Sequence, residues 1–499
     1  MSDEASSALS IPASVGLVHQ NPLGLALVLF GLYWLSKVFQ SVDTSRPPLA
    51  RSWIPWVGSA IEMGKDPDRF FASMTNLLGP MFRLKLLGQE RIFVTSPSLI
   101  STIYRDSQSF DFLSVRVDIG EMIFSLNPRL GRQPYMLETY MPALHHALLP
   151  SNVQPMISAY ISSAHDSIRS TVANMDGKSV PLLSLIIPPA YHAACHAAFG
   201  PGFPAEESYP LFRGFDDSFH LLATNIPRIF LSRPLKSWDK LVDLIEAYIS
   251  GLGDDLEEAG HFVQVAIRGR EAGWTNRDIA AVLGTQLWAL QANAVFAAYW
   301  LVALQLQQKE GLAPLIEEID TAREFWQATH PSASFGTSFF EDIASSSSKS
   351  LPLVTSAIQE TLRYTSQTYS IRRVVKPVQL GGYELRPDEQ VICVTRQTHV
   401  DDEVFPEASE FNFRRYVENP KAMKDGKLVP NHTMAFGGGV SMCEGRHFAM
   451  TELKMFVSIL LTHASIELDP KSSSRPTFAW ERQGIMHPRG DLQVIVKRQ

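Results

Sequence analysis

The sequence has only three cysteines, Cys195, Cys393 and Cys443, among its 499 residues. This number excludes the disulfide framework of a small secreted protein, and it fits a reducing compartment in which one thiol serves as a ligand or nucleophile. A surplus of basic residues is also missing, because 44 Lys and Arg are outnumbered by 51 Asp and Glu. The balance argues against a nucleic-acid-binding protein, which needs a basic surface. Charged residues make up 19% of the chain and hydrophobic ones 45%, so the composition favours a large folded core.

The N-terminal segment has no Asp, Glu, Lys or Arg between Glu4 and Lys37. The apolar stretch inside it is about 18 residues long, close to the minimum for crossing a bilayer. Basic residues follow it, which places the rest of the chain on the cytosolic side by the positive-inside rule. A buried core helix and a cleaved signal peptide are the alternatives, and the absence of basic residues before the stretch argues against the second. We predict an N-terminal segment, a transmembrane anchor and a proline-rich tether at residues 1–21, 22–39 and 40–58.

Residues 59–499 have the pattern of one mainly α-helical domain with small β-sheets. The longest helical pattern is apolar almost all round, which indicates a helix that crosses the core. Apolar spacing predicts helices at residues 153–172, 241–256, 276–306, 314–328, 351–364 and 445–461. Strands are predicted at residues 82–95, as a hairpin about Gly88-Gln89, and at 373–380 and 390–394.

The loop before the last predicted helix carries a cysteine among glycines, in the order Phe436-Gly437-Gly438-Gly439-Val440-Ser441-Met442-Cys443-Glu444-Gly445. Consecutive glycines permit a tight turn, and the N–H groups of a following helix favour a thiolate. A soft thiolate in such a loop is what haem iron needs as its proximal ligand, and Phe436 can cover a flat cofactor. The alternative is a free cysteine beside an ordinary glycine turn, and this motif alone leaves both open.

A second group of residues combines opposite charges on an apolar helix. Glu360 and Arg363 are three residues apart and therefore share one helix face. Arg415, in the segment Phe411-Asn412-Phe413-Arg414-Arg415-Tyr416, is able to close a three-way ion network with them. The alternative is a surface salt bridge, which contributes little to stability.

The order of these motifs resembles the cytochrome P450 superfamily of haem-thiolate enzymes, and the resemblance extends from about Arg46 to the C-terminus. It implies the cytochrome P450 fold, haem b as cofactor, Cys443 as the ligand of the iron, and a structural network of Glu360, Arg363 and Arg415. Residues 287–293 resemble the central helix of cholesterol 7α-hydroxylase and prostacyclin synthase. The stretch around Cys443 resembles fungal biosynthetic members of the superfamily.

The chain departs from the family pattern at the position two residues before the cysteine. Most members have a basic residue there that contacts a haem propionate, whereas this chain has Ser441. Arg372 matches another propionate-binding position, and His145 or His146 is an alternative source of a contact. The cofactor-binding set implied by the resemblance is Cys443, Phe436, Arg372, Gly437, Gly445 and His145.

A larger departure lies in the central helix, where most monooxygenases carry an acid–threonine pair that relays protons to the site of oxygen activation. The matching residues here are Ala292 and Asn293, which we take as the catalytic candidates. This pair has no carboxylate, although the Asn amide can hydrogen-bond a ligand or a water. The resembling hydroxylase and the resembling synthase both have Asn, so the pair leaves hydroxylation and rearrangement open.

We therefore expect a single-pass endoplasmic reticulum monooxygenase that inserts one oxygen from O2 into an apolar small molecule, such as a sterol, terpenoid or other natural product of fungal secondary metabolism. Electrons are expected from NADPH through a separate reductase, because no dinucleotide-binding G-x-G-x-x-G follows a predicted strand. The expected partners are this reductase, membrane lipid and the apolar substrate, without nucleic acid. The alternatives are a reductase-independent haem-thiolate isomerase or dehydratase, and a haem-binding protein without catalysis.

Overall fold

The structure is a computed structural model that divides into two compact units, residues 1–46 and residues 47–499, and the second contains the fold described below. The described residues are 24–25, 28–29, 31–32, 43–52, 54, 56–224, 226–253, 256–333, 336–345, 350–418, 421–472 and 475–499. The predicted N-terminal segment, residues 1–21, lies outside the described residues, and the predicted anchor, residues 22–39, lies mostly outside them.

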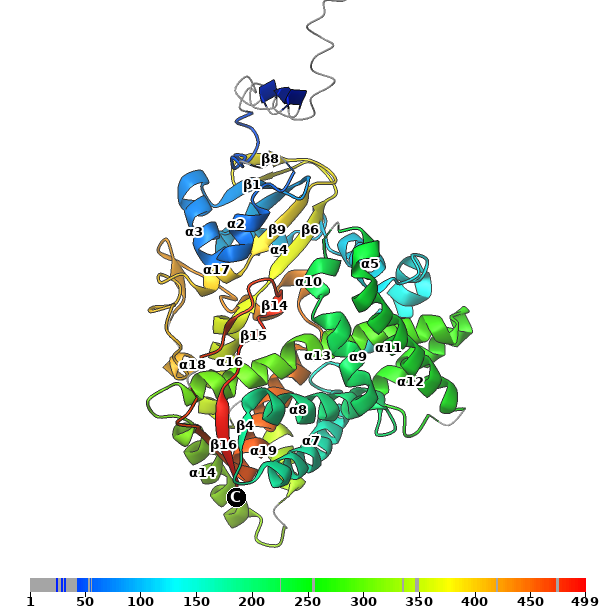
Figure 1. Cartoon of the computed structure of the whole chain (residues 1–499), viewed down its shortest axis with the longest axis vertical. Helices are drawn as coiled ribbons and strands as arrows, with labels where there is room; N and C mark the ends of the chain where they lie inside the picture. The colour runs from blue at the N-terminus through cyan, green and yellow to red at the C-terminus, as the bar shows by residue number, and fades with distance from the viewer. Residues whose placement is uncertain are drawn as a thin grey trace, which may run out of the picture. The chain divides into compact units, whose positions relative to one another are not determined.

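The core of the second unit is built around α13 (Asn276–Leu306), a helix of 31 residues that begins with a capping box between Thr275 and Asp278. It packs against four long helices, α8 (Leu182–Phe199), α11 (Ser232–Gly251), α16 (Pro352–Thr365) and α19 (Arg446–His463). Figure 1 shows α13 crossing the middle of this unit, between the largest sheet and the group formed by α7 (Gln154–Met175), α8 and α19. A helix so enclosed needs apolar side chains on most of its faces, as its sequence has.

Further helices complete the helical part of the unit. They are α2 (Ala60–Lys65), α3 (Pro67–Leu78), α4 (Pro97–Arg105), α5 (Leu113–Phe124), α6 (Met141–Ala147), α9 (Ala205–Asp216), α10 (Phe219–Leu222), α12 (His261–Ile267), α14 (Ala313–Thr329), α15 (Thr337–Ser345), α17 (Arg396–His399) and α18 (Arg415–Glu418). Single turns of other helix types are η1 (Leu130–Arg132), η2 (Tyr135–Tyr140), η3 (Arg228–Leu231), η4 (Arg268–Ala272), η5 (Met434–Phe436) and η6 (Gly439–Ser441).

The largest sheet has five strands in the order β1-β2-β9-β6-β3, with β2 and β9 parallel and the other pairs antiparallel. Its strands are β1 (Met81–Leu86), β2 (Gln89–Val94), β3 (Phe110–Asp111), β6 (Tyr369–Val374) and β9 (Gln390–Val394). Part of the predicted tether lies along this sheet, because the Ala50 N–H donates to the Arg83 carbonyl and the Arg83 N–H donates to the Pro48 carbonyl.

Five smaller sheets are present among the described residues. Their strands are β4 (Ser179–Pro181), β5 (Ser366–Gln367), β7 (Val378–Leu380), β8 (Tyr383–Leu385), β10 (Met423–Lys424), β11 (Lys427–Leu428), β12 (Ala464–Leu468), β13 (Thr477–Phe478), β14 (Gly484–Ile485), β15 (Pro488–Arg489) and β16 (Gln493–Arg498). The pair β5–β14 brings the segment after α16 next to the C-terminal turn, and this turn lies on α13.

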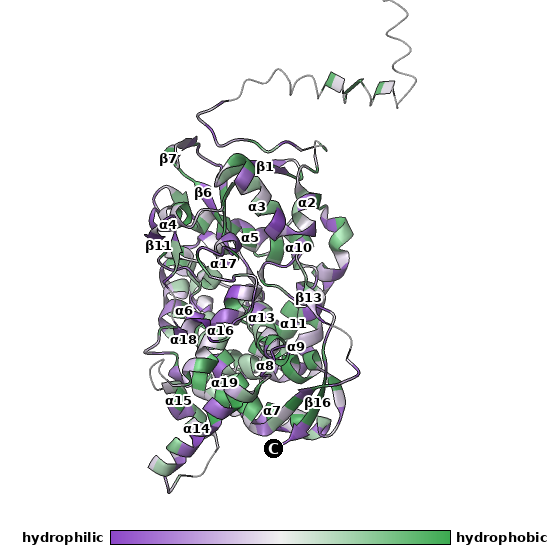
Figure 2. Cartoon of the chain, turned by 90° about the vertical axis from the view of Figure 1, so that its left-hand side faces the viewer, coloured by the Kyte–Doolittle hydropathy of each residue, from purple (hydrophilic) through white to green (hydrophobic). Residues whose placement is uncertain are grey.

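The predicted mainly α-helical architecture with small sheets is confirmed. The sequence analysis missed α8, whose interior contains Pro188 and Pro189, residues that usually end helices. Among the described residues, α8 and α13 are long and apolar enough to cross a membrane, and both are largely buried inside this unit. Hydrophobic residues dominate α8 and α13, whereas the outer helix α14 carries many hydrophilic ones (Figure 2).

Candidate functional site

The Cys443 loop is a compact turn that ends at the first residue of α19. The backbone N–H of Cys443 donates to the carbonyl of Phe436 at 2.9 Å and closes the loop. Phe436 is half-buried at the end of η5. Gly445 is the N-cap of α19, and a Cβ at this position would lie 4.0 Å from the Cys443 sulfur. The sulfur therefore lies beside the N-terminus of a long helix, as the sequence predicts.

The glycines of this loop allow it to press against Tyr104 of α4. A Cβ on Gly438 would lie 2.4 Å from the Tyr104 ring, and a Cβ on Gly439 would lie 2.1 Å from the Tyr104 carbonyl oxygen. Gly437 has a φ of +73°, a conformation that residues with side chains rarely adopt. The three consecutive glycines are thus required by conformation at Gly437 and Gly439, which has a φ of +60°, and by close approach at Gly438 and Gly439.

The three cysteines differ in accessibility. Cys195 and Cys393 are buried, and burial raises the pKa of Cys393 to about 12, so both are neutral thiols. The Cys443 side chain keeps an exposed face, although protein fills most of the volume around its sulfur. Desolvation raises the pKa of the Cys443 thiol, and a hydrogen bond with the backbone of Gly445 opposes this rise. A thiolate at this position therefore needs a further positive partner, and a bound metal ion supplies one.

Arg372 links the largest sheet to the Cys443 loop. The guanidinium is buried, donates to the Gly438 carbonyl at 3.4 Å and also hydrogen-bonds the Ser441 hydroxyl. It lies over the rings of Tyr104 and Phe112, with its central carbon 5.2 and 5.0 Å from the ring centres. Ser441, which replaces the usual basic residue of the family, is therefore in direct contact with the arginine that the sequence analysis assigned to a propionate.

His145 and His146 are both exposed near the end of α6, and their surroundings differ. His146 hydrogen-bonds the side chain of Asn152, whereas His145 lies close enough to Glu444 to lower the pKa of that carboxyl. Arg116 of α5 acts on Glu444 in the same direction and more strongly, although desolvation raises this pKa overall. His145 and Arg116 thus lie near the residue that follows Cys443, and Arg116 was missed because 327 residues separate it from the cysteine.

Glu360, Arg363 and Arg415 form the predicted three-way ion network. The carboxylate accepts from Arg363 at 2.7 and 2.8 Å, from Arg415 at 3.0 Å and from the Asn412 backbone at 3.0 Å. The side chains of Glu360 and Arg363 are 0% exposed and that of Arg415 is 5% exposed. The remaining guanidinium donors are taken up by the carbonyls of His399, Pro406, Glu407, Ala408 and Glu410. A surface salt bridge is thereby excluded.

Asn293 lies on a face of α13 that is less buried than the rest of the helix. Ala289, one turn earlier on this face, is exposed, whereas Ala292 is buried. The Asn293 carbonyl oxygen Oδ1 accepts from the backbone N–H of Ile485 in β14 at 2.8 Å. Within the described part of the chain, the amide nitrogen Nδ2 has no hydrogen-bond partner, so it is free to donate to a ligand or a water.

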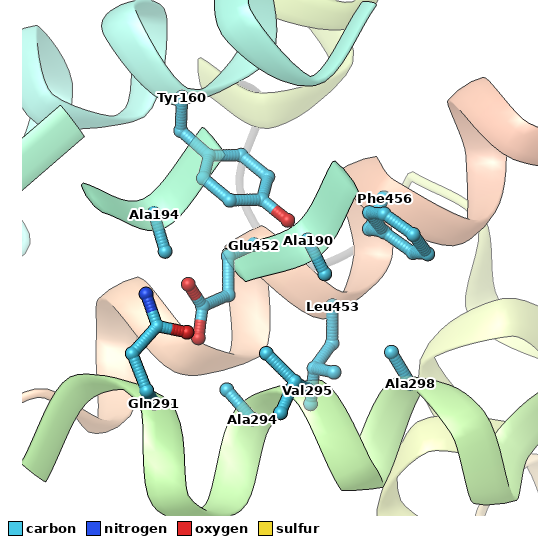
Figure 3. Close-up of a pocket in the computed structure, with 10 residues that line it drawn as sticks. All are labelled: Tyr160, Ala190, Ala194, Gln291, Ala294, Val295, Ala298, Glu452, Leu453 and Phe456. Atoms are coloured by element: carbon cyan, nitrogen blue, oxygen red, sulfur yellow. The ribbon is translucent and has the colours of Figure 1, made fainter. Parts of the chain in front are cut away.

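A small pocket lies between α7, α8, α13 and α19, next to this part of α13 (Figure 3). Gln291 and Glu452 face it, and Tyr160 closes it from α7. Burial raises the pKa of Glu452 well above its ordinary value, because desolvation disfavours the charged carboxylate. The position of Glu452 on α19, nine residues after Cys443, connects the pocket to the cysteine loop through one helix.

The residues around Cys443 fit the haem that the resemblance implies. An accessible sulfur at a helix N-terminus would be a suitable ligand for haem iron, and glycine at position 445 leaves the space beside the sulfur free of a side chain. Arg372, Arg116 and His145 supply positive or hydrogen-bonding groups for carboxylates. By the family pattern, Cys443 would hold the iron, Phe436, Gly437 and Gly445 would shape the loop, and Arg372 and His145 would contact the propionates.

Comparison with known proteins shows the family of the chain. The sequence profile described as cytochrome P450 matches residues 47–496. Cytochrome P450 7A1 of Oryctolagus cuniculus is 22% identical, with 95% of this chain and 98% of that protein covered. Prostacyclin synthase of Rattus norvegicus is 25% identical, with 95% and 98% covered. Cytochrome P450 7B1 of Mus musculus is 26% identical, with 94% of each chain covered. The predicted similarity to this group is confirmed.

Solved structures share the fold at low sequence identity. The retinoic acid-bound cyanobacterial CYP120A1 superimposes with a TM-score of 0.72 at 17% identity, covering 91% of this chain and 99% of that one. The haem domain of cytochrome P450DA gives a TM-score of 0.71 at 14% identity, covering 91% and 98%. The family implies haem as the cofactor, an oxidoreductase activity and electron supply by a redox partner. With the profile match, the fold and the cysteine loop in agreement, the chain belongs to the cytochrome P450 family.

Proposed function

We propose that this protein is a haem-thiolate monooxygenase that inserts one oxygen atom from O2 into an apolar small molecule, of the sterol, terpenoid or another natural-product class, in fungal secondary metabolism. Cys443 carries this proposal, because it is exposed at the N-terminus of α19 while both other cysteines are buried. Haem bound by a thiolate supplies activation of O2, since the electron-rich sulfur favours cleavage of the O–O bond.

The residues of the chain itself supply orientation and proton handling. Asn293 is fixed by the bond from Ile485 to its Oδ1, which leaves its Nδ2 as a positioned donor on the less buried face of α13. Ala292 next to it has no polar side chain, so Asn293, with a water, is the local group for moving a proton. The role that an acid–threonine pair has in most members is thereby assigned to one amide.

The membrane part of the proposal follows from the sequence. Residues 22–39 anchor the chain in the endoplasmic reticulum membrane as a single span, with the catalytic unit in the cytosol, in contact with membrane lipid. A separate reductase delivers the electrons of NADPH. Deletion of residues 1–40 should move the protein from the membrane fraction toward the soluble fraction and preserve its ferrous–CO spectrum.

The rival reaction class is isomerisation or dehydration without a reductase, which the similarity to prostacyclin synthase favours. The test is turnover of candidate scaffolds by the full-length protein with and without reductase and NADPH, followed by mass spectrometry. We expect products heavier by one oxygen atom only when both are present. Products of unchanged mass that form without NADPH would assign the enzyme to the isomerases, and absence of any product across a broad apolar panel would favour the non-catalytic alternative.

A further inference from the structure

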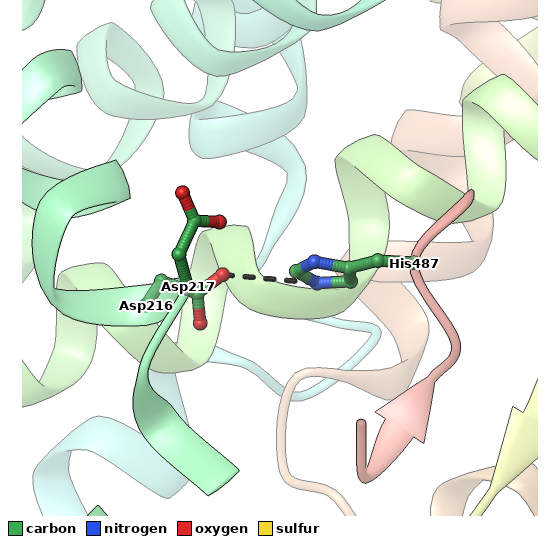
Figure 4. A group of neighbouring side chains, drawn as sticks. All are labelled: Asp216, Asp217 and His487. Carbon is green, nitrogen blue, oxygen red and sulfur yellow. Dashed lines mark ion pairs between the residues drawn. The ribbon is translucent and has the colours of Figure 1, made fainter. Parts of the chain in front are cut away.

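A second buried polar group lies where the end of α9 meets α13 and the segment before β15. We call it the Asp216 cluster, and its members are Arg213, Asp216, Trp288, Arg482 and His487. Figure 4 shows Asp216 and Asp217 at the end of α9, with the ring of His487 pointing toward them from the C-terminal segment. The proposed function uses none of these residues.

Asp216 is the centre of the cluster and is 0% exposed. One carboxylate oxygen, Oδ1, accepts from Arg482 at 2.6 Å and from the Trp288 indole at 2.9 Å. The other oxygen, Oδ2, has no hydrogen-bond partner among the described residues; it lies 3.8 Å from an Arg213 nitrogen and 3.7 Å from Nε2 of His487. One oxygen of this buried carboxylate is therefore hydrogen-bonded, and the other receives no hydrogen bond from the described residues.

His487 faces that free oxygen with an acceptor of its own. Its ring stacks on Phe296 of α13 at 3.6 Å between centres and hydrogen-bonds the backbone of Ala292. Burial, and then the two arginines, lower the pKa of His487, so the imidazole is neutral. A neutral imidazole that donates one N–H to a carbonyl has a lone pair on its other nitrogen. Two acceptors, Asp216 Oδ2 and His487 Nε2, thus face each other, and neither receives a hydrogen bond from the described residues.

Two unpartnered donors belong to the same cluster. Arg482 Nε and Arg213 Nη1 are buried and have no hydrogen-bond partner within the described chain. Buried polar atoms without partners are costly, so a concentration of them indicates a bound group that supplies the missing bonds. A hydroxyl group has one donor and two acceptor lone pairs, so it can pair with the two free donors and with one of the two free acceptors.

The charges of the cluster select a neutral group. Asp216 pairs with Arg482, and the neighbouring Asp217, which is outside the cluster and 55% exposed, pairs with Arg213 at 2.5 Å, so each arginine of the cluster has an acidic partner. A carboxylate ligand would face two aspartates, and an amine or a metal ion would face two guanidinium groups. The oxygen and nitrogen ligand atoms of Asp216, Asp217 and His487 do lie within 4.8 Å of one another, but both carboxylates already bind arginine.

The cluster borders the face of α13 that carries Asn293. Its contacts on α13 come from Trp288, Ala292 and Phe296, which are spaced four residues apart along one stripe, and the adjacent stripe carries Ala289 and Asn293. Aromatic side chains extend away from the cluster, because Phe219 stacks on Trp288 at 4.3 Å and Phe124 contacts the same ring. One ligand fits both features if its apolar body lies against these rings and its polar group lies in the cluster.

We propose that the Asp216 cluster binds a hydroxyl group of the otherwise apolar substrate and so determines which carbon of that substrate is presented for reaction. This inference rests on the proposed function, which supplies the substrate. The cluster is then a specificity determinant: substrates of this enzyme are alcohols, and their parent hydrocarbons bind weakly.

The test uses full-length, haem-loaded protein and three pairs of an alcohol with its parent hydrocarbon: cholesterol and cholest-5-ene, cedrol and cedrane, 2-decalol and decalin. Binding is measured as the shift of the haem Soret band. At least one alcohol should bind with a dissociation constant about tenfold or more below that of its hydrocarbon. Equal affinity in every pair, or binding in none, would show that water alone satisfies the cluster and would overturn the proposal.

Variants connect this preference to the cluster. His487→Phe keeps a ring to stack on Phe296 and removes Nε2, so it should reduce the preference to less than about threefold with hydrocarbon binding unchanged. Asp216→Asn should do the same; if it fails to bind haem, His487→Phe decides alone. His463→Phe is the matched control, because it removes an equally unpartnered imidazole nitrogen at the far end of α19. A preference that survives in His487→Phe would refute the assignment.

The binding measurement needs neither reductase nor NADPH. A clear alcohol preference without any oxygenated product would leave the cluster assigned and refute the proposed reaction. Oxygenated product without an alcohol preference would support the proposed reaction and refute the assignment of the cluster.

Discussion

Glu360→Gln tests the structural network with the least change in shape. Glu360 accepts four hydrogen bonds at 2.7–3.0 Å, three of them from arginines that are 0% and 5% exposed. Glutamine fills the same space, but it has no charge and turns an NH2 group toward guanidinium donors. Removing one member of a buried charge network costs about 3–5 kcal/mol. Because whole domains are stable by only about 5–15 kcal/mol, the variant should be close to unfolding at physiological temperature.

The assay is denaturant-induced unfolding of the haem-loaded protein, followed by its ferrous–CO absorbance, together with haem content after expression. A loss of this size lowers the ratio of folded to unfolded protein by roughly two to four orders of magnitude. The control is Asp243→Asn, which breaks the ion pair between Asp243, 65% exposed, and Arg277, 44% exposed. This substitution should change the free energy of unfolding by less than about 1 kcal/mol. If Glu360→Gln has normal haem content and an unfolding midpoint equal to that of the control, the network does not support the haem loop.

Three further predictions concern the cysteine, the central helix and the buried acid. Cys443→Ser should abolish the ferrous–CO band typical of thiolate-bound haem, while Cys195→Ser and Cys393→Ser should keep it; survival of the band in Cys443→Ser would refute the ligand assignment. If the protein is a monooxygenase, Asn293→Leu should lower the amount of product formed per NADPH consumed; if it is an isomerase, the same change should slow turnover without NADPH dependence. The control Asn293→Asp retains the acceptor for the Ile485 N–H and so separates the structural role of the residue from its chemical role. Unchanged rate and coupling in Asn293→Leu would show that the residue is only structural. Burial raises the pKa of Glu452 in the folded state, so the stability that depends on its protonation is complete below the ordinary value of 4.5 and is lost as pH rises toward the raised pKa. In thermal unfolding, Glu452→Gln should therefore stabilise the protein more at pH 8 than at pH 5. An equal effect at both pH values would contradict a buried neutral acid.

The features that could be predicted from the sequence are those whose residues are close together in it. The Cys443 loop and the Glu360–Arg363 pair have short spacings, and α13 has an uninterrupted apolar pattern between residues 276 and 306, which are also the limits of the helix. The hairpin at residues 82–95 was equally clear, because alternating residues surround a Gly-containing turn and form β1 and β2.

Features that depend on tertiary contacts could not be predicted. The Asp216 cluster joins residues 266 positions apart, and its charges carry no local signal. His145 and His146 are neighbours in sequence but point in different directions from one helix, and their different partners distinguish them only in the folded chain. The helix α8 was not predicted, and its interior contains Pro188 and Pro189, residues that lack the N–H group an α-helix uses.

The contact between Gly484 and Asn293 makes two distant positions interdependent in evolution. A Cβ on Gly484 would lie 2.1 Å from the Asn293 Oδ1, and Gly484 has a φ of +81°. Any larger residue at 484 therefore requires a smaller one at 293, so the two positions should covary among relatives. Gly484→Ala alone should lower haem content, and adding Asn293→Ala should restore part of it, although the strained backbone remains. The side chain that α13 can carry at position 293 is thus constrained by the turn at Gly484, which lies much later in the sequence, near the C-terminus.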